Sequence, residues 1–332
     1  MLKEYVVLPT YHEAENLRLL LPRLKRYSVI VVDDDSRDGT KDVCRKHPNV
    51  RLFVRKKKSG LSSAVLYGIK MIREKDAKIV VMDADMQHDP EKLPEFFRKL
   101  DKSGFVYGSR HARDFSVSRR FYSWLAATLA KTMIPHTKGI DDVMSGYFGF
   151  RLKAVDIQKI KPKGYKIMLD VLVNLRPGTK TDKVYFVFGK RIHGRSKLGP
   201  AVIFSFLSQL LSLSQYRLVY FSAVGISGIV VNEGAAYLLH PFLPLWADFL
   251  IAIELSILSN FLLNHYITFH RRVRFLRALP RYNLVALVGL SVNLGVAIAL
   301  SYLIFYLTAD LIGIIAAFGF NYTLSERFAW AK

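Results

Sequence analysis

The chain has 332 residues, which is long for one compact core and indicates about two domains. A hydrophobic content of 51% beside 23% charged residues excludes a disordered or fibrous chain, and the single cysteine, Cys44, excludes an intramolecular disulfide framework and a cysteine-based zinc site. The net charge of +22 predicts anionic partners, a class that includes nucleic acid, nucleotide phosphates and acidic lipid headgroups.

The N-terminal part of the chain alternates strand and helix signals. Short apolar runs predict strands at residues 5–9, 29–32, 51–54 and 79–82. Helical periodicity between and after them predicts helices at residues 11–24, 38–46 and 62–73. This alternation is typical of a mainly parallel sheet with helices on both faces. We therefore expect a Rossmann-like α/β domain over residues 1–200.

Two amphipathic segments follow. Residues 117–134 place Phe121 and Trp124 opposite Arg119 and Arg120, a pattern that suits a helix lying in the membrane interface. Residues 201–213 have a similar character, and we interpret 201–217 as an interfacial helix or linker.

Residues 218–332 form a charge-poor tail with seven Lys or Arg and five Asp or Glu. Its four long apolar stretches lie at residues 219–239, 246–269, 284–307 and 311–330. About 20 helical residues cross the ~30 Å hydrocarbon layer, whereas core helices of soluble proteins seldom stay apolar on all sides for so long. The sequence therefore predicts a membrane domain of four transmembrane helices, with a large soluble core as the alternative.

The loops of this tail predict its orientation. The loop at 270–283 is rich in arginine, whereas the loops at 240–245 and 308–310 contain no Lys or Arg. Basic residues near transmembrane ends are held on the cytosolic side. We therefore expect a multi-pass membrane protein, in the plasma membrane if the source is prokaryotic, with the N-terminal domain, the arginine-rich loop and Lys332 in the cytosol.

Acidic residues follow two of the predicted strands. Asp33, Asp34 and Asp35 come after the second strand, and Asp83 and Asp85 come after the fourth. Because ligands of such sheets bind at the carboxyl ends of the strands, we expect both acidic clusters to converge on one edge.

The run from Asp83 to Gln87 offers alternating oxygen ligands. This pattern suits a hard cation that keeps some water and bridges substrate phosphates, so Mg²⁺ or Mn²⁺ fits and zinc does not. A solvated turn is the alternative for such a pair of acids. The sequence contains neither a P-loop nor a Gly-x-Gly-x-x-Gly run after a strand, which excludes the common ATP and NAD cradles.

These residues resemble a known family. The matching runs are Pro9 to Glu13, Asp33 to Thr40, Asp83 to Glu91, Gly108 to Arg110, Ser145 to Arg151, Gly164 to Ile167 and Gly194 to Leu198. Together they resemble family 2 (GT-A) glycosyltransferases, more narrowly the polyprenyl-phosphate glycosyltransferases of the dolichyl-phosphate mannose synthase type. The tail is similar to the GtrA-like membrane domain fused to some of these enzymes.

The resemblance implies roles for individual residues. The donor nucleoside would be held by Pro9, Tyr11, Glu13 and Asp34. The divalent cation and the donor diphosphate would be held by Asp83, Asp85 and Gln87. The acceptor and donor phosphates would be bound by Arg110, Arg119, Ser123, Arg191 and Lys197, although Arg119 could instead contact lipid headgroups. The sequence departs from the family at His12, where Asn is usual, and at Asp35, where Gly is usual.

The implied reaction is a metal-dependent, inverting transfer of a hexose from a nucleotide sugar to a polyprenyl phosphate. By resemblance, Gln87 and His88 favour the mannose branch of the family. We therefore expect transfer of mannose from GDP-mannose to a polyprenyl (dolichyl) phosphate at the cytosolic membrane face. Two alternatives remain open: transfer of glucose from UDP-glucose, and a lipid-linked-sugar flippase with a regulatory soluble domain. Nucleic acid is excluded as a partner, because the basic residues are interspersed with acidic strand ends and form no single stripe.

Overall fold

The computed structural model describes residues 2–56, 60–110, 117–162, 164–189, 199–270 and 273–331, without the side chains of residues 117–119 and 121. The chain divides into two compact units, Met1–Leu213 and Ser214–Lys332. The division falls inside the segment 201–217 that the sequence predicts as a linker.

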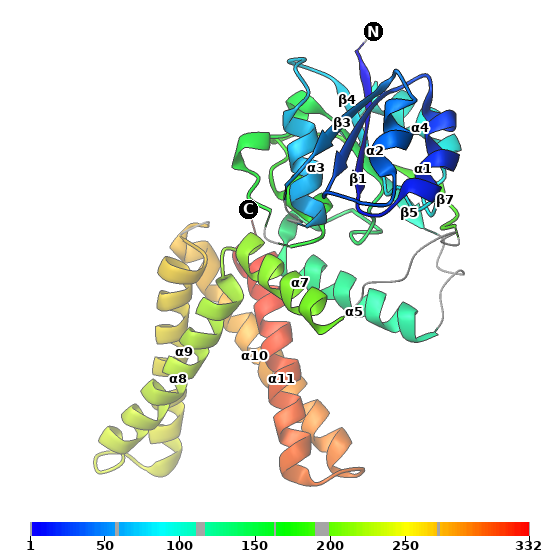
Figure 1. The fold of residues 1–332 in the computed structure, drawn as a ribbon. Helices are drawn as coiled ribbons and strands as arrows, with labels where there is room; N and C mark the ends of the chain where they lie inside the picture. Colours follow the sequence, from blue (N-terminus) through cyan, green and yellow to red (C-terminus); the bar gives the residue numbers. More distant parts are fainter. Residues whose placement is uncertain are drawn as a thin grey trace. The chain divides into compact units, whose positions relative to one another are not determined.

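A sheet forms the centre of the first unit (Figure 1). It has seven strands in the order β3-β2-β1-β4-β6-β5-β7. Its strands are β1 (Glu4–Thr10), β2 (Ser28–Asp33), β3 (Val50–Val54), β4 (Lys78–Val81), β5 (Phe105–Arg110), β6 (Phe148–Arg151) and β7 (Thr181–Phe186). Among these strands only β6 runs antiparallel to its neighbours. The mainly parallel α/β sheet predicted from the sequence is confirmed.

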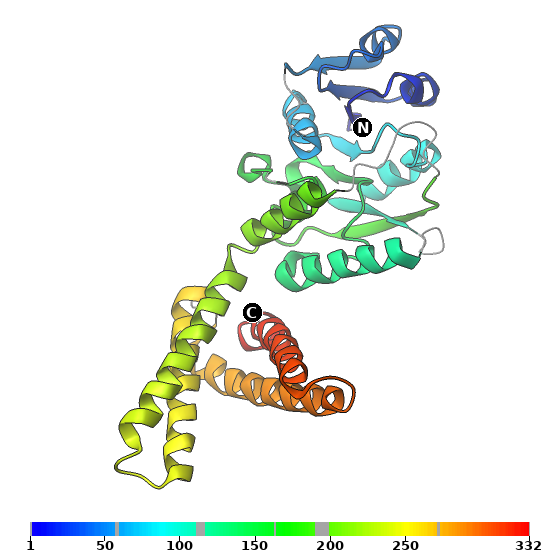
Figure 2. The same cartoon turned by 60° about the horizontal axis from the view of Figure 1, so that its bottom comes forward.

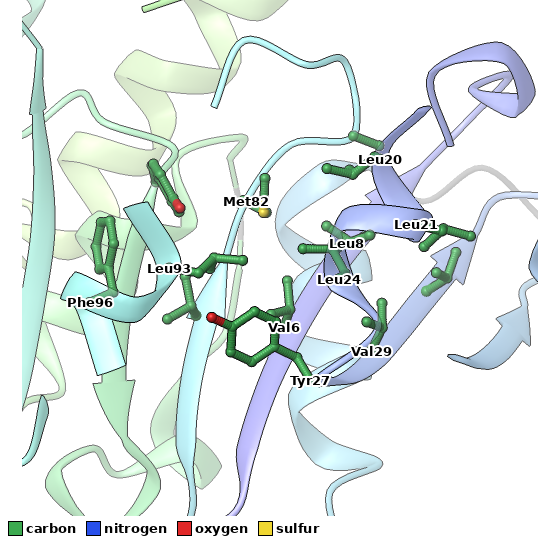
Figure 3. Close-up of a cluster of buried hydrophobic side chains, with 14 of the residues drawn as sticks. Val6, Leu8, Leu20, Leu21, Leu24, Tyr27, Val29, Met82, Leu93 and Phe96 are labelled. Atoms are coloured by element: carbon green, nitrogen blue, oxygen red, sulfur yellow. The ribbon is translucent and has the colours of Figure 1, made fainter. Parts of the chain in front are cut away.

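Helices cover both faces of the sheet. The helices of the first unit are α1 (Ala14–Leu20), α2 (Thr40–Arg45), α3 (Leu61–Lys70), α4 (Leu93–Leu100), α5 (Val117–Met133), α6 (Ile167–Val173) and α7 (Pro200–Leu213), with short 3₁₀ turns η1 (Leu21–Leu24), η2 (Pro90–Lys92), η4 (Pro135–Thr137), η5 (Leu152–Ala154) and η6 (Ile157–Lys159). Successive strand residues point to opposite faces. Val6 and Leu8 accordingly join a core with α1 and α4 (Figure 3), whereas Val7 faces α3.

Two predicted helices are shorter than their periodicity suggests. The segment predicted at 11–24 begins as a helix only at Ala14 and continues from Leu21 as a 3₁₀ turn, because Pro22 lacks the N–H that would extend the α-helical hydrogen bonding. The segment predicted at 38–46 begins at Thr40, because Gly39 has a φ of 91° and the Asp38 carboxylate accepts a hydrogen bond from the Thr40 N–H.

The glycine at position 68 lets α3 approach the sheet closely. A Cβ at this position would lie 2.9 Å from Val7 and 3.0 Å from Val32, too close for any larger residue. On the opposite face, burial raises the pKa of Cys44 to about 12, so this thiol is an apolar core residue.

The second unit consists of two helical hairpins (Figure 2). The first pairs α8 (Arg217–Leu239) with α9 (Leu245–Leu263), and the second pairs α10 (Phe275–Ser301) with α11 (Tyr306–Leu324). Both α9 and α11 continue into a π-helical turn, η7 (Asn264–Thr268) and η8 (Ser325–Ala329). All four helices are long and apolar enough to cross a membrane, which confirms the predicted number of spans.

The boundaries of the second hairpin differ from the prediction. The predicted loop at 308–310 lies within α11, and the turn occurs at 302–305 instead. This turn is aromatic and aliphatic, so hydropathy alone does not mark it; such residues are common where helices leave the bilayer. The helix α10 also begins earlier than the predicted span, so that Arg277 and Arg281 lie on a helix.

The two hairpins repeat a sequence pattern. The first hairpin carries Gly228, Asn232 and Asn260. The second hairpin carries the same residue types at the same spacing, as Gly289, Asn293 and Asn321. In each hairpin the Asn at the end of this pattern packs directly against the glycine of the facing helix, which leaves no room there for a Cβ. The π-helical turns of the two hairpins occupy equivalent positions as well.

Candidate active site

One edge of the sheet gathers the predicted site residues of the strands and loops. Strands β1, β2, β4 and β5 run in the same direction, so their carboxyl ends share this edge. Tyr11 and Glu13 follow β1, Asp34 follows β2, residues 83–87 follow β4, and Arg110 ends β5. Because β1 separates β2 from β4, the two acidic strand ends are about 10 Å apart at the usual strand spacing.

The loop after β4 is tightly folded. Asp85 is 5% exposed, and its Oδ1 accepts a hydrogen bond from the Gln87 N–H at 3.1 Å. Between them Met86 has a φ of 65°, a left-handed conformation that is unfavourable for a long side chain and reverses the chain direction. Strain of this kind is typical of functional loops.

His88 supports this loop from within the core. Its Nδ1 accepts a hydrogen bond from the Asp83 N–H at 2.9 Å, which places the proton of the neutral ring on Nε2, 3.8 Å from Asp83 Oδ2. Desolvation lowers the pKa of His88 to about 3, so the ring is neutral at physiological pH. The ring stacks on Tyr147 at 4.9 Å, and the Tyr147 hydroxyl donates to the Asp89 carbonyl at 3.0 Å.

The segment after β7 lies against the same loop. Gly189 donates its N–H to the Gln87 carbonyl at 3.0 Å, and the Gln87 Nε2 donates to the Gly189 carbonyl at 3.1 Å. A Cβ at Gly189 would lie 2.9 Å from the Met86 carbonyl oxygen, so only glycine permits this approach. These bonds also orient the Gln87 amide, with Nε2 toward Gly189.

The three acidic residues at the end of β2 have different surroundings. Asp33 is a buried structural group that accepts hydrogen bonds from the Ser36 N–H, the Ser36 hydroxyl and the Thr10 hydroxyl. At Asp35, a hydrogen bond from the Lys41 ammonium lowers the pKa of the carboxyl. Asp35 has a φ of 59°, which explains why glycine suits this position.

Asp34, the residue predicted to hold the nucleoside, is paired with Arg55. The guanidinium Nε donates to Asp34 Oδ1 at 2.6 Å, and the same group donates to the Ser63 hydroxyl and to the Gly60 carbonyl. Both side chains of the ion pair are nearly buried. Arg55 was not among the predicted residues, yet it directly follows the predicted strand at 51–54 and therefore lies at the same edge.

The other residues predicted to hold the nucleoside lie between the end of β1 and the start of α1. Pro9 lies within β1, and Tyr11 contacts His12 edge-on with ring centroids 4.3 Å apart. His12 has a φ of 60°, and its N–H donates to the Ser36 hydroxyl at 2.8 Å. Glu13 accepts a hydrogen bond from Asn16 at 2.6 Å. These residues therefore lie beside the loop that follows β2.

Arg110 forms a bidentate ion pair with Asp142, a residue that the sequence analysis missed. The Arg110 Nε donates to Asp142 Oδ2 at 2.6 Å and its second nitrogen donates to Oδ1 at 2.7 Å. The guanidinium also lies over the Phe188 ring, 5.5 Å from its centroid. Such fork-to-fork pairs fix the orientation of a guanidinium.

Lys166 is a second cation near the site that the sequence analysis did not assign. Its ammonium donates to the Met144 carbonyl at 2.7 Å. Both Lys166 and Arg110 act electrostatically on His88 and oppose its protonation, whereas Asp85 and Asp142 favour it.

The other predicted phosphate-binding residues are less fully described. Ser123 lies on α5 and is half-buried. Arg119 lies on the same helix, but its side chain is outside the described part of the structure. Arg191 and Lys197 fall in residues 190–198, also outside the described residues.

The site offers few metal ligands of its own. Within the described part of the chain, no three His, Cys, Asp or Glu side chains gather as possible ligands. Asp83, Asp85 and Gln87 supply two carboxylates and an amide, an all-oxygen set that suits Mg²⁺ or Mn²⁺ when water and substrate phosphates complete the shell.

Comparisons with known proteins agree with this architecture. Residues 5–157 match glycosyl transferase family 2, and residues 220–330 match the GtrA/DPMS transmembrane domain. A dolichol-phosphate mannosyltransferase from Pyrococcus furiosus is 36% identical over 99% of this chain and 100% of its own length.

Two further relatives match about six tenths of the chain. A dolichol-phosphate mannosyltransferase from Saccharomyces cerevisiae is 35% identical over 64% of this chain and 87% of its own length. An undecaprenyl-phosphate mannosyltransferase from Micrococcus luteus is 32% identical over 59% of this chain and 88% of its own length. The chain is therefore an enzyme of the family 2 glycosyltransferases, related over its whole length to a dolichol-phosphate mannosyltransferase, and a multi-pass membrane protein with a GtrA/DPMS transmembrane domain.

Proposed function

We propose that the protein transfers a mannosyl residue from GDP-mannose to a polyprenyl phosphate of the dolichyl type at the cytosolic face of a membrane. The full-length relationship to the Pyrococcus furiosus enzyme carries this proposal, because it includes both the catalytic and the membrane unit. The geometry of the sheet edge supports it, since Asp34 after β2, Asp83 and Asp85 after β4, and Arg110 at the end of β5 share one edge of the sheet.

Asp83, Asp85 and Gln87 would hold a Mg²⁺ or Mn²⁺ ion together with the donor diphosphate. The Gln87 Nε2 donates a hydrogen bond to the Gly189 carbonyl, so the amide oxygen Oε1 points away from Gly189. This orientation supports Oε1 as the third metal ligand beside the carboxylates of Asp83 and Asp85. When bound, the ion would neutralise charge on the leaving diphosphate.

Pro9, Tyr11, Glu13 and Asp34 would hold the nucleoside of the donor. Pro9 lies at the end of β1, Tyr11 and Glu13 follow β1, and Asp34 follows β2. Strand β1 is the neighbour of β4, whose loop carries Asp83 and Asp85. Arg55 would keep the Asp34 carboxylate oriented, since it is itself anchored by Ser63 and Gly60. The predicted phosphate-binding residues Arg110, Arg119, Ser123, Arg191 and Lys197 would bind the acceptor phosphate and the donor phosphates.

The chemical step requires positioning and no strong base. A phosphate monoester has a second pKa of about 6, so the acceptor oxygen is largely ionised near neutral pH. This oxygen attacks the anomeric carbon of the sugar. The new oxygen–carbon bond forms as the bond from that carbon to the diphosphate oxygen breaks, GDP leaves with the electron pair, and the anomeric configuration inverts. Orientation and charge stabilisation supply the catalysis.

An apolar surface on α5 and α7 would bring the site to the lipid. Trp124 and Tyr122 on α5 are 61% and 66% exposed, and Phe204 on α7 is 76% exposed. The two helices contact each other, and residues 214–216 join α7 directly to the first membrane-spanning helix. A polyprenyl phosphate cannot leave the bilayer, so these aromatic side chains would rest at the headgroup level.

The basic residues of the membrane unit support a cytosolic site. Arg274, Arg277 and Arg281 lie at the start of α10, whereas the turns at 240–244 and 302–305 contain no Lys or Arg. By the positive-inside rule, the end of the unit with the arginines faces the cytosol.

The test is a transfer assay with the purified full chain in detergent. Radiolabelled GDP-mannose and UDP-glucose are each offered with dolichyl phosphate, in the presence of Mn²⁺, Mg²⁺ or a chelator. We expect lipid-linked mannose with either metal and none with the chelator. Product from UDP-glucose alone would assign the donor differently, and activity that survives complete metal removal would refute the metal assignment.

A further inference from the structure

A buried glutamine attaches the helix α7 to the rest of the first unit. Gln209 is fully buried, and its Nε2 donates hydrogen bonds to Asp170 Oδ2 at 2.5 Å and to the Lys166 carbonyl at 3.0 Å. Its Oε1 accepts from the Lys166 N–H at 3.3 Å. The Gln209 side chain therefore bridges α7 to the first turn of α6 and to the residue before it.

The surroundings are adapted to this side chain. Gly164 packs directly against the Gln209 amide and leaves no room for a Cβ. Asp170, 1% exposed, lies within α6 and points its carboxyl at Gln209. Burying an amide and a carboxyl is costly compared with apolar packing such as that of Phe206 and Leu210 on the same helix. Simple docking of α7 would not need these polar groups, so their arrangement points to positioning.

The contact continues into the active site through Lys166. The Lys166 backbone is held by Gln209, while its ammonium donates to the Met144 carbonyl at 2.7 Å. Met144 belongs to the loop at 141–146, which we name the bracing loop. In this loop Asp142 holds Arg110 by a bidentate ion pair.

The far end of the bracing loop touches the acidic loop after β4. A Cβ at Gly146 would lie 3.3 Å from Asp83 Oδ2 and 3.2 Å from the His88 ring, so these groups are in close contact. A displacement of Lys166 would therefore reach both the guanidinium of Arg110 and the carboxylate of Asp83. Misplacement of such groups by about 1 Å is enough to cost about a hundredfold in rate.

We propose that Gln209 is a positioning residue of the transfer reaction: by fixing Lys166 it makes the bracing loop, and with it Arg110 and Asp83, depend on the placement of α7. The inference rests on the proposed function, in which α7 lies at the lipid surface and Arg110 and Asp83 bind the phosphates and the metal. The new element is that a displacement of α7 would shift Arg110 and Asp83, the residues proposed to bind the phosphates and the metal.

A double-mutant cycle on the full chain tests this coupling. The variants are Gln209→Leu, Lys166→Met and the two combined, and kcat is measured for mannosyl transfer from GDP-mannose to dolichyl phosphate. We expect each single substitution to lower kcat by about tenfold and the double variant by about the same factor, because both break one chain of contacts. Losses that multiply to about a hundredfold would overturn the proposal.

One control separates positioning from docking. Leu210→Ala removes apolar packing of α7 and leaves the Gln209 bonds intact, so we expect a lower unfolding temperature with kcat within about twofold of wild type. If it lowers kcat as much as Gln209→Leu does, Gln209 is only a docking residue. If Gln209→Leu does not accumulate in the cell, Gly164→Ala replaces it in the cycle. The added Cβ displaces the Gln209 amide, while the sequence of α7 stays unchanged.

A binding measurement keeps this result separate from the reaction itself. GDP binding in the presence of Mn²⁺ is measured by calorimetry for the same variants. We expect Gln209→Leu and Lys166→Met each to weaken binding severalfold, without an additive effect in the double variant. If the wild-type protein binds GDP but transfers no mannose, the proposed function fails, while the binding data for the variants still test the coupling. If Gln209→Leu changes neither GDP binding nor kcat, the coupling is refuted.

Discussion

The imidazole Nδ1 of His88 accepts a hydrogen bond from the main-chain N–H of Asp83, and this one contact fixes the start of the loop that carries the acidic residues. Burial keeps the ring neutral, so the acceptor is present throughout the physiological pH range. Because the Asp83 N–H has this partner inside the core, the loop does not depend on solvent for its geometry.

The variants His88→Leu and His88→Asn should therefore differ. Leucine removes the acceptor and leaves the Asp83 N–H unsatisfied, which lowers the stability of the fold by about 1–3 kcal/mol. The loop that carries Asp83 and Asp85 then loses its fixed position, so we expect kcat to fall by about tenfold or more. Asparagine can place an amide oxygen near the position of Nδ1, and most of the activity should remain. Initial rates across a Mn²⁺ titration measure both effects; equal losses in the two variants would contradict a positioning role.

Asp85→Asn should nearly abolish turnover. The substitution preserves the size of a side chain that is 5% exposed but removes its charge, so expression and membrane insertion should be unaffected. The matched control is Asp42→Asn, since the Asp42 side chain is 74% exposed and pairs only with Arg45 on the surface of α2 among the contacts described. Retained mannosyl transfer in Asp85→Asn would defeat the metal assignment.

Arg110→Lys should lower kcat/KM by about ten- to a hundredfold. Lysine keeps the charge, but it cannot form the bidentate pair with Asp142 that orients the guanidinium. Asp142→Asn should cause a smaller loss, because the guanidinium remains and only its orientation weakens. Steady-state kinetics with varied donor and varied acceptor would locate the effect; a lysine variant as active as wild type would exclude a role for guanidinium geometry.

The sequence predicts the acidic part of the site because parallel strands obey a simple rule. Asp34, Asp83 and Asp85 follow predicted strands, and a parallel sheet brings such residues to one edge. Arg55 obeys the same rule and could have been found by it. Asp142 could not have been found in this way, because it precedes β6. The start of β6 lies at this edge of the sheet only because β6 runs antiparallel to β4 and β5.

Lys166 and Gln209 were beyond prediction for a different reason. Their partners are distant in sequence, and no periodicity of α6 or α7 distinguishes a buried glutamine from an exposed one. In the membrane unit, hydropathy gave the number of helices, but the apolar turn at 302–305 has no polar signal, so the last boundary was misplaced.

Asp170 should make stability depend on pH. Desolvation raises the pKa of Asp170 from 3.8 to about 7, so the folded chain binds a proton that the unfolded chain releases between these values. Stability therefore falls as pH rises from about 4 to 7 and levels off above, by at most about 4 kcal/mol for this group. Asp170→Asn keeps the acceptor for Gln209 and removes the titration.

We accordingly expect Asp170→Asn to unfold at a higher temperature than wild type at pH 7.5, and the difference between the two proteins to shrink toward pH 4. Thermal unfolding in detergent over this range gives the comparison. A difference that stays constant with pH would show that the Asp170 carboxyl does not titrate in this window.

The buried ion pair of the membrane unit should be sensitive to the loss of one partner. Arg217, the first residue of α8, lies 3.0 Å from Glu326 in the turn after α11, and their side chains are 4% and 0% exposed. Glu326→Gln leaves the guanidinium without its counter-charge, which costs about 3–5 kcal/mol when a buried pair is broken.

The combined variant Arg217→Met with Glu326→Gln removes both charges and should recover much of the lost stability, because the expensive state is the single uncompensated charge. Arg327→Gln, an exposed neighbour, is the control for charge loss alone. Unfolding temperatures in detergent test the order wild type, double variant, single variant. If the double variant is less stable than Glu326→Gln by itself, the uncompensated Arg217 guanidinium is not the costly state.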